Sequence, residues 1–385
     1  MTQLPAKEQS QHAAMDMAES LVRWAAGEGV KLDGIEPKET AEHGFGMVAI
    51  RKLQEGDVIM TVPIKTIRSL STVSKTISSK LPQDASIHGL LAADLLFNPP
   101  KATHWGKLVP KLADFQEQVP YFWSKSLQEL LPVEAKTLLA KQQATFRRDW
   151  EQFKIGFPDT NMQDYLYAWF LVSTRAFYYE TPQTLPYPWH DRLALLPVAD
   201  LFNHAATGCS VSYSLSGSYT ITADREYVEG EEVCTSYGRH SNDFLLAEYG
   251  FVLPDNSADL VSLDDVIPPK LSGEQKASLD GKGVLGNFML SADSKPCDRT
   301  KAALHQLLNG AATESDGGLD SQNTPSGTDA LLSSLLAELL NRIKSTRRAI
   351  STSGAGTASQ RAVLVQRWDQ IEAILKQSIE VLDRS

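Results

Sequence analysis

The stretch 195-LLPVADLFNHAATGCSV-211, together with 229-EGEEVCTSYGRHSNDFLLAEYGFVLPDN-256, decides how the rest of this chain is interpreted. Asn203 and His204 stand together directly after an apolar run, and Tyr237 lies in a Ser-Tyr-Gly turn about 30 residues later. Short segments of alternating polarity separate them, which is typical of strands and not of a regular helix. These three residues are therefore the first candidates for chemistry.

Composition limits the function classes that remain. The chain has 385 residues, of which 42% are hydrophobic and 22% charged, as in ordinary globular proteins. Its length predicts two or three domains. The formal net charge is −10, and no run rich in Lys and Arg occurs beyond isolated pairs such as Arg147-Arg148 and Arg347-Arg348, so the chain lacks the basic footprint of a nucleic-acid-binding protein.

Cysteine and histidine spacing argue against a metal site. The three cysteines, Cys209, Cys234 and Cys297, contain no CxxC pair, which excludes a disulfide scaffold and a four-cysteine zinc site. No two of the eight histidines have the HExxH spacing of a zinc protease. We therefore expect no metal.

The chain also lacks the signals of secretion and membrane insertion. The N-terminus MTQLPAKEQSQ is polar and has no apolar core like that of a signal peptide. No apolar run reaches the roughly 18 residues that a membrane span needs. We expect a cytoplasmic or nuclear protein, neither secreted nor membrane-bound, that is a monomer and binds no nucleic acid.

Periodicity changes several times along the chain and predicts an α+β fold. Two β-rich segments enclose a helical insert of about a hundred residues, and a mostly helical region follows. Within that last region, residues 310–329 are rich in Gly, Ser and Asp and are predicted to be a disordered loop. The predicted segments are 1–30 (N-terminal helix), 31–84 (first β part), 85–184 (helical insert), 185–254 (second β part) and 255–385 (helical domain).

Of three familiar enzyme motifs, one occurs in the wrong structural context and two do not occur in the sequence. Gly44, Gly46 and Ala49 formally match the dinucleotide fingerprint GxGxxG/A, but the residues that follow predict a strand where that motif needs a helix. No GxSxG elbow of a serine hydrolase occurs, and no GxxxxGK[ST] loop of a nucleotide hydrolase. Taken alone, His204 and Tyr237 are also explained as a buried histidine and a core aromatic residue.

In combination, five segments carry a more specific signal. They are, in order, 43-HGFGMVAI-50, 173-STRAFYYE-180, 197-PVADLFNH-204, 234-CTSYG-238 and 248-EYGFV-252. This ordered set resembles the SET-domain protein methyltransferases, in particular the branch of the Rubisco large-subunit and ribosomal-protein lysine methyltransferases. The resemblance covers roughly residues 20–255, and the C-terminal region resembles that branch's substrate-binding domain more loosely.

The resemblance implies S-adenosyl-L-methionine as cofactor and a protein lysine on a non-histone substrate as methyl acceptor, with a ribosomal protein as one candidate. It implies that Tyr237 is catalytic and orients the methyl group and the amine. Phe177, Asp200 and Tyr249 match positions that contact the substrate, although Asp200 is also explained as a brace for the turn before Asn203. The cofactor-binding residues implied in the same way are His43, Gly44, Phe45, Arg175, Asn203 and His204.

Two alternatives stay open. A related branch methylates histidine and carries a polar residue where Phe177 stands, whereas an apolar wall suits the aliphatic part of lysine better. The second alternative is a catalytically silent SET-like module that binds a partner through its helical domain. The presence of Tyr237, Asn203 and His204 together argues against it, because a binding module does not need all three.

Overall fold

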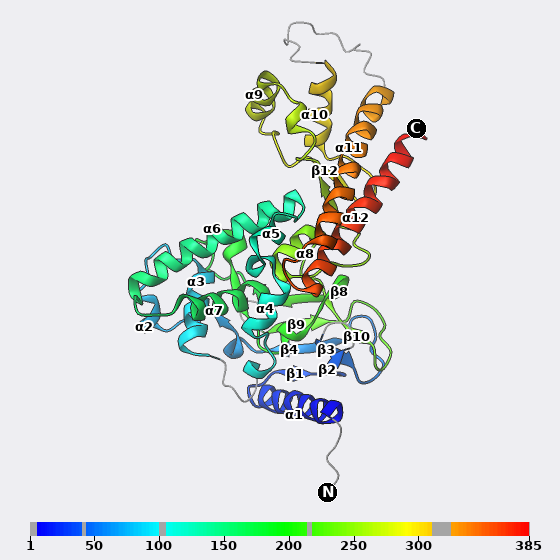
Figure 1. The fold of residues 1–385 in the computed structure, drawn as a ribbon. Helices are drawn as coiled ribbons and strands as arrows, with labels where there is room; N and C mark the ends of the chain where they lie inside the picture. The colour runs from blue at the N-terminus through cyan, green and yellow to red at the C-terminus, as the bar shows by residue number, and fades with distance from the viewer. Residues whose placement is uncertain (1–5, 41–43, 100–104, 214–217, 310–324, 385) are drawn as a thin grey trace. The chain divides into compact units, whose positions relative to one another are not determined.

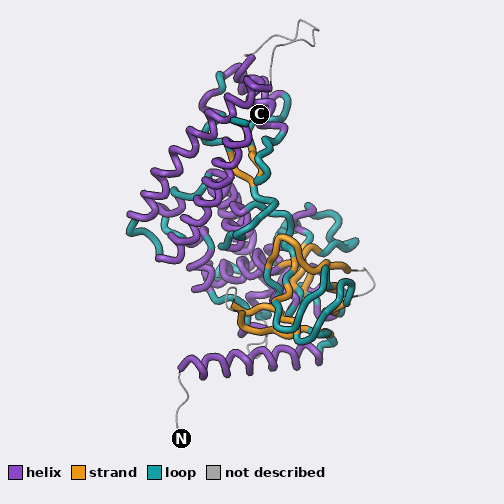
Figure 2. Tube along the Cα trace, turned by 90° about the vertical axis from the view of Figure 1, so that its right-hand side faces the viewer, coloured by secondary structure: helices purple, strands orange, loops and turns teal. Residues whose placement is uncertain are grey.

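The computed structural model describes residues 6–40, 44–99, 105–213, 218–309 and 325–384 (Figure 1). They divide into two units by their contacts. Unit 1 comprises residues 1–113 and 143–238, and unit 2 comprises residues 114–142 and 239–385. The predicted α+β class is confirmed, with small antiparallel sheets concentrated in unit 1 and a mostly helical unit 2 (Figure 2).

Unit 1 carries its strands in small antiparallel sheets. Within the described residues their orders are β1-β4-β9-β8, β10-β3-β2 and β5-β7-β6. Its strands are β1 (Lys31–Leu32), β2 (Ile35–Thr40), β3 (Gly44–Ala49), β4 (Val58–Val62), β5 (Arg68–Ser69), β6 (Ala176–Tyr178), β7 (Leu193–Leu195), β8 (His204–Tyr213), β9 (Tyr219–Thr222) and β10 (Glu232–Val233).

Strand β3 settles the question of the glycine fingerprint. Residues Gly44–Ala49 pair antiparallel with β2 along their whole length, from Ala49 opposite Ile35 to Gly44 opposite Thr40. The other side of β3 pairs with β10. No helix starts at these glycines, so the sequence-based rejection of a dinucleotide-binding turn is correct.

The helices of unit 1 support these sheets. They are α1 (Ala6–Gly27), α2 (Lys75–Ser78), α3 (Ile87–Phe97), α7 (Met162–Arg175) and the C-terminal part of α6 (Val133–Gly156). Helix α3 is apolar on almost every side, and its residues from Leu90 to Leu95 are all buried, as expected of a helix inside a core. It packs against α7, whose first turn is capped by the Asn161 side chain accepting a hydrogen bond from Gln163 N at 2.7 Å.

Unit 2 is built on long helices with one small sheet. Its elements are α4 (Leu112–Gln118), α5 (Lys125–Gln128), the N-terminal part of α6, α8 (Asn242–Tyr249), β11 (Leu260–Ser262), α9 (Gly273–Gly281), β12 (Met289–Ser291), α10 (Asp298–Asn309), α11 (Pro325–Thr352) and α12 (Ala358–Leu382). Apolar residues recur at helical spacing over 332–343 and again over 364–382, which predicts two antiparallel helices, and α11 and α12 pack together there. Most positions of the two stripes are buried, namely Leu332, Leu336, Leu339, Ile343, Leu364, Trp368, Ile371 and Leu375, whereas Ile379 and Leu382 near the end of α12 are half-buried.

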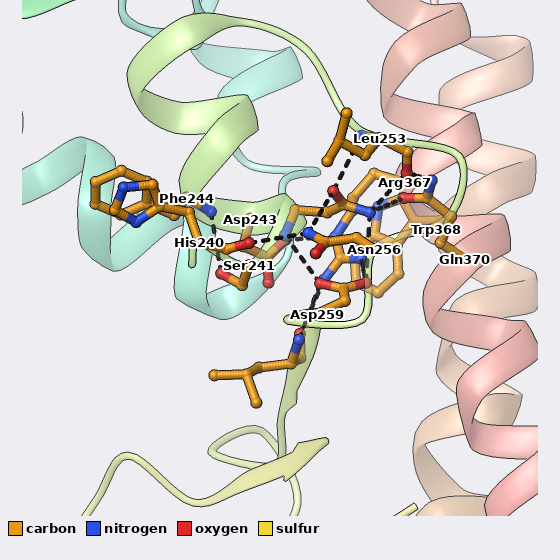
Figure 3. A network of polar contacts seen from close by, with 12 residues as sticks. His240, Ser241, Asp243, Phe244, Leu253, Asn256, Asp259, Arg367, Trp368 and Gln370 are labelled. Carbon is orange, nitrogen blue, oxygen red and sulfur yellow. Dashed lines mark hydrogen bonds and ion pairs between the residues drawn. The ribbon is translucent and has the colours of Figure 1, made fainter. Parts of the chain in front are cut away.

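A buried charge network ties α12 to the rest of unit 2 (Figure 3). The Arg367 side chain is fully buried, and its Nε donates to Asp243 Oδ1 at 2.8 Å while its Nη1 donates to Asp259 Oδ2 at 2.6 Å. Its Nη2 donates to the carbonyl of Leu260 at 3.0 Å. Burial raises the pKa of the Asp243 carboxyl, and the neighbouring guanidinium opposes this shift. The sequence pattern did not predict this buried cation.

The unit boundaries differ from the predicted domain limits in two respects. Residues 114–142 of the predicted helical insert belong to unit 2, and unit 2 begins again at residue 239 and not at 255. Within the predicted helical insert, residues Ala176–Tyr178 form strand β6. Of the predicted loop 310–329, residues 310–324 lie outside the described residues, and residues 325–329 form the first turn of α11, because the apolar stripe of that helix begins soon afterwards.

Candidate active site

Two segments of unit 1 cross at the centre of the predicted site. The start of β8 and the chain after β10 run parallel, with bridges from Thr235 to both His204 and Cys209. Thr235 N donates to Asn203 O at 2.9 Å, and Cys209 N donates to Cys234 O at 2.9 Å. Gly208 allows the close approach, since a Cβ there would lie 2.7 Å from the carbonyl of Cys234.

The Asn203 side chain fastens this crossing to β3. Its Nδ2 donates to the carbonyl oxygen of Phe45 at 3.2 Å and to Glu232 Oε1 at 2.7 Å. Gly46 makes room for this amide, because a Cβ at Gly46 would lie 2.8 Å from Asn203 Nδ2 and closer still to Glu232 Oε1. The start of β3 and the Asn-His pair therefore lie side by side.

Tyr237 is held at both ends by the same crossing. Its backbone N donates to His204 Nδ1 at 3.0 Å, and its hydroxyl donates to the carbonyl oxygen of Phe202 at 2.8 Å. The rings of Tyr237 and His204 lie 5.0 Å apart between centroids. Because Nδ1 accepts a hydrogen bond, the His204 ring carries its proton on Nε2. The polar ends of Tyr237 are therefore fixed relative to the Asn-His pair.

The Tyr237 hydroxyl stays neutral at physiological pH. Burial raises its pKa to about 12, an effect that Arg175 opposes and Asp200 reinforces. The hydroxyl donates its one proton to the Phe202 carbonyl, so the phenolic oxygen can take part in any further hydrogen bond only as an acceptor. Tyr237 is suited to orienting a group by hydrogen bonding and not to acting as a phenolate base.

A second cluster joins the end of α7 to the turn before Asn203. Arg175 Nη1 donates to the backbone carbonyl of Asp200 at 2.6 Å and lies 3.2 Å from Asp200 Oδ2. The indole N–H of Trp105 donates to the same Oδ2 at 2.8 Å. Burial raises the pKa of the Asp200 carboxyl, whereas Arg175 and Trp105 favour its ionised form.

The turn that carries Asp200 is strained. It is the one-turn 3-10 helix Ala199–Leu201, and the residue before it, Val198, has a φ of 76°. A β-branched residue rarely adopts this left-handed conformation, which costs on the order of 1 to 3 kcal/mol. Val198 is nonetheless fully buried, so its packing and the contacts of Asp200 hold the backbone there. Such strain is typical of functional sites.

The remaining predicted residues have different surroundings. Gly44 begins β3, and Phe45 follows it in the strand. Phe177 lies in β6 and packs edge-to-face on Tyr219, with ring centroids 5.8 Å apart. Tyr249 ends α8 in unit 2, where its ring lies near Phe244 and Phe251. His43 lies outside the described residues.

The sequence motifs did not assign three residues that the structure places at the site. Glu232 accepts the Asn203 amide, Gly46 leaves space for it, and Trp105 donates to Asp200. The second glycine of 44-GFG-46 was a usable signal, since a glycine inside a strand often marks close backbone approach. Nothing in the local pattern around Trp105 points to Asp200, because the two are 95 residues apart.

One buried side chain of the site offers an unused donor to an anionic or zwitterionic ligand. Arg175 Nε is buried and has no hydrogen-bond partner within the described part of the chain, and it lies next to the Asn203 turn. A free guanidinium N–H is a suitable donor for a carboxylate. Among the described residues, no group of three or more His, Cys, Asp or Glu side chains could hold a metal ion. None of the described helices is long and apolar enough to span a membrane.

Comparison with known proteins gives protein N-methyltransferases among the relatives. The chain is 25% identical to the ribosomal lysine N-methyltransferase set11 of Schizosaccharomyces pombe over 83% of this chain and 87% of that protein. It is 25% identical to the actin-histidine N-methyltransferase of Danio rerio over 64% of this chain, but it spans only 44% of that protein's length.

Solved structures share the fold of this chain, and a family model matches the part of it that contains the candidate site. The fold is similar to that of Rubisco LSMT bound to AdoMet, with a TM-score of 0.64, 18% identity and coverage of 96% of this chain and 92% of that chain. The model of the SET domain matches residues 44–238, from the first residue of β3 to the glycine after Tyr237. Since this match contains the crossing, the Asn-His pair and Tyr237 and spans half of the sequence, the chain belongs to the SET-domain family.

Proposed function

We propose that this chain is an S-adenosyl-L-methionine-dependent protein-lysine N-methyltransferase that acts on a non-histone protein, with ribosomal proteins as the substrate class. The observation that carries the proposal is the neutral Tyr237 hydroxyl, held by the Phe202 carbonyl beside the Asn-His crossing. The ribosomal lysine N-methyltransferase of fission yeast, similar over most of both chains, supports the substrate class.

The reaction needs alignment more than acid or base strength. S-adenosyl-L-methionine supplies a methyl group on a sulfonium, which is already an activated donor. The lysine amine, after losing its proton, forms the new C–N bond as the S–C bond breaks, and S-adenosylhomocysteine leaves. The contribution of the protein is to hold the amine in line with the methyl group and to exclude water.

Tyr237 fits this task as an orienting group. Its proton is directed to the Phe202 carbonyl, which leaves the phenolic oxygen as an acceptor for the N–H of the incoming amine. An unperturbed lysine has a pKa near 10.4, and a poorly solvated channel lowers the pKa of an amine by disfavouring its charged form. Phe177 is proposed to contribute an apolar wall to this channel, and Asp200 and Tyr249 are proposed to contact the substrate.

The cofactor is proposed to lie against Gly44 and Phe45 at the start of β3 and against the Asn203-His204 pair. The side chains of Asn203 and His204 already brace the crossing, so their part in binding would come from their backbone. Arg175 keeps a buried Nε donor that suits the carboxylate of the cofactor's amino acid part. His43 is proposed to bind the cofactor only because it belongs to the motif 43-HGFGMVAI-50.

The helical region 255–385 is proposed to recognise the protein substrate, and we propose a monomer that works in the cytoplasm, where ribosomes are found. The match to the fission-yeast enzyme over 87% of its length supports the first point, because it extends beyond the SET domain. The acidic net charge of −10 is favourable for a basic partner.

One alternative function has specific support. The actin-histidine N-methyltransferases are relatives of this chain, so histidine is the competing acceptor. The apolar Phe177 side chain, packed against Tyr219, favours lysine. A silent binding module is the other alternative, and an intact Tyr237 with its hydrogen bonds argues against it.

One experiment separates these functions. The purified chain is incubated with methyl-labelled S-adenosyl-L-methionine and ribosomal proteins prepared from cells that lack this protein, whose target residues are therefore unmethylated. Acid hydrolysis of the labelled band is expected to yield methyl-lysine. Methyl-histidine would move the enzyme to the alternative branch. Absence of both label and cofactor binding in calorimetry would favour the binding module.

A further inference from the structure

Trp105 contacts the candidate site from a part of the chain that no sequence motif connects with it. The residue begins the short 3-10 helix Trp105–Lys107 in the helical insert and is only 4% exposed. Its indole N–H donates to Asp200 Oδ2 at 2.8 Å. Since a buried indole N–H needs an acceptor, this bond fixes the ring and the carboxylate relative to each other.

Asp200 connects Trp105 to Arg175 and to the turn that ends at Phe202. Its backbone carbonyl accepts from Arg175 Nη1 at 2.6 Å. The turn that begins next to the strained Val198 ends at Phe202, whose carbonyl accepts the Tyr237 hydroxyl. A shift of this turn by a fraction of an ångström would therefore move both the Arg175 side chain and the acceptor of the Tyr237 hydroxyl.

We infer that Trp105 is a positioning residue for methyl transfer: through its hydrogen bond to Asp200 it holds the 199–202 turn, and with it Tyr237, in the reactive arrangement. The inference rests on the proposed function, because positioning has a meaning only for an enzyme that performs the reaction. The hydrogen bond of the Trp105 indole goes to Asp200, and Asp200 in turn contacts Arg175.

The pKa of the Asp200 carboxyl should also depend on Trp105. The side chain is fully buried, and its Oδ1 has no hydrogen-bond partner among the described residues, so the ionised form relies on few donors. Those donors are Trp105 and Arg175, and Tyr237 is the other titratable group whose charge interacts with Asp200. Loss of the indole N–H removes a hydrogen bond to the charged form and raises the pKa of Asp200 further.

The chain offers a closely matched control. Trp169 is also almost fully buried in unit 1, and its indole N–H donates to a buried carboxylate, Asp149 Oδ2, at 3.0 Å. A Trp→Phe change at either position removes one indole N–H and keeps an aromatic ring. The two variants should lose similar amounts of folding free energy, but only Trp105→Phe should alter the turn next to Tyr237.

The test measures methyl transfer against pH for the full-length wild type, Trp105→Phe and Trp169→Phe, with labelled S-adenosyl-L-methionine and the unmethylated ribosomal proteins. Trp105→Phe is expected to lower kcat about tenfold with little change in KM, whereas Trp169→Phe keeps the wild-type kcat. Deprotonation of the substrate amine makes the rate fall toward acid in every variant. Protonation of Asp200 at low pH makes the rate fall a second time and more steeply. Because Trp105→Phe raises the pKa of Asp200, this second fall should occur at higher pH in that variant.

A second variant keeps the inference testable if Trp105→Phe does not fold. In Asp200→Asn the amide oxygen still accepts the indole N–H, but the side chain no longer titrates, so the second acid fall should vanish. If it persists, or if folded Trp105→Phe and Trp169→Phe behave alike, Trp105 is only a core residue. If the wild type itself transfers no methyl group, the proposed function fails, and the inference fails with it.

Discussion

At the scale of single residues, the site is held together mainly by hydrogen bonds to backbone groups. Asn203 donates to the carbonyl of Phe45, Tyr237 donates to the carbonyl of Phe202, and the backbone N of Tyr237 donates to His204. Backbone acceptors cannot be replaced by mutation, so the side-chain partner decides whether each contact exists. The effect of removing one side-chain group is therefore predictable.

Tyr237→Phe is expected to leave cofactor affinity nearly unchanged and to cut turnover at least tenfold, which corresponds to about 1.4 kcal/mol in the activation barrier. The reason is that the ring and the backbone contact to His204 remain, while the oriented oxygen is lost. Calorimetry with S-adenosylhomocysteine and single-turnover kinetics give the two quantities. Tyr227→Phe, which removes a hydroxyl bonded to Asp224, is the control. Equal turnover in both variants would remove Tyr237 from the catalytic role.

Gly46→Ala is expected to weaken cofactor binding and to destabilise unit 1. A Cβ at this position would collide with the Asn203 amide and the Glu232 carboxylate, so the contact between β3 and the crossing must open. Denaturant unfolding and a cofactor titration measure both effects. Gly27→Ala provides the control, because a Cβ at Gly27 in α1 meets no atom within 4 Å. If Gly46→Ala binds the cofactor with wild-type affinity, the contact between β3 and the crossing does not contribute to cofactor binding.

At the scale of elements, the sequence predicts what local periodicity determines. The apolar stripes that became α11 and α12 are buried as expected, and the strand-like residues after Gly46 form β3. The interior of α12 was not predictable in full, because Arg367 lies on a face that the pattern of Leu364, Trp368 and Ile371 marks as apolar. Its partners come from α8 and the chain before β11, which only the tertiary fold brings near.

Arg367→Met is expected to destabilise unit 2 by about 3 to 5 kcal/mol, because it leaves two buried carboxylates without their cation. The pKa of Asp243 should rise further in the variant, so the variant's deficit relative to the wild type should shrink as the pH falls and the carboxyl becomes neutral. Urea unfolding at neutral and acid pH measures this. Arg384→Met, which breaks an exposed pair with Glu380, should cost little at either pH. A similarly small cost for Arg367→Met would mean that the packing of α12 alone suffices.

At the scale of the whole molecule, family membership was accessible from sequence, while the division into units was not. Five short motifs in a fixed order indicated the SET domain, and the matching family model confirms it. Residues 114–142 could not be assigned to unit 2 by composition, because a helical pattern does not say against which core a helix packs. The hydrogen bond from Trp105 to Asp200 was hidden for the same reason, since it joins segments that are distant in sequence.

Cofactor binding is expected to stabilise the folded chain against heat. A ligand present at 100 times its dissociation constant stabilises the state that binds it by about 2.7 kcal/mol. S-adenosylhomocysteine should therefore raise the melting temperature of the wild type. It should raise that of Asn203→Ala much less, since this change releases the crossing from both Phe45 and Glu232. An equal shift in both proteins would show that the cofactor binds elsewhere.

The crossing of the β8 segment with the chain around Thr235 can form only late in the synthesis of unit 1. A polypeptide growing on the ribosome presents Asn203 and Cys209 well before their backbone partners, Thr235 and Cys234, have been added. Tyr237 follows only two residues after Thr235. A nascent chain that stops just short of this point has most of the sheet strands of unit 1, yet it has neither the crossing nor the tyrosine. Cofactor capture by arrested chains of increasing length would therefore begin abruptly and not gradually, at the moment these last residues of unit 1 become free to fold.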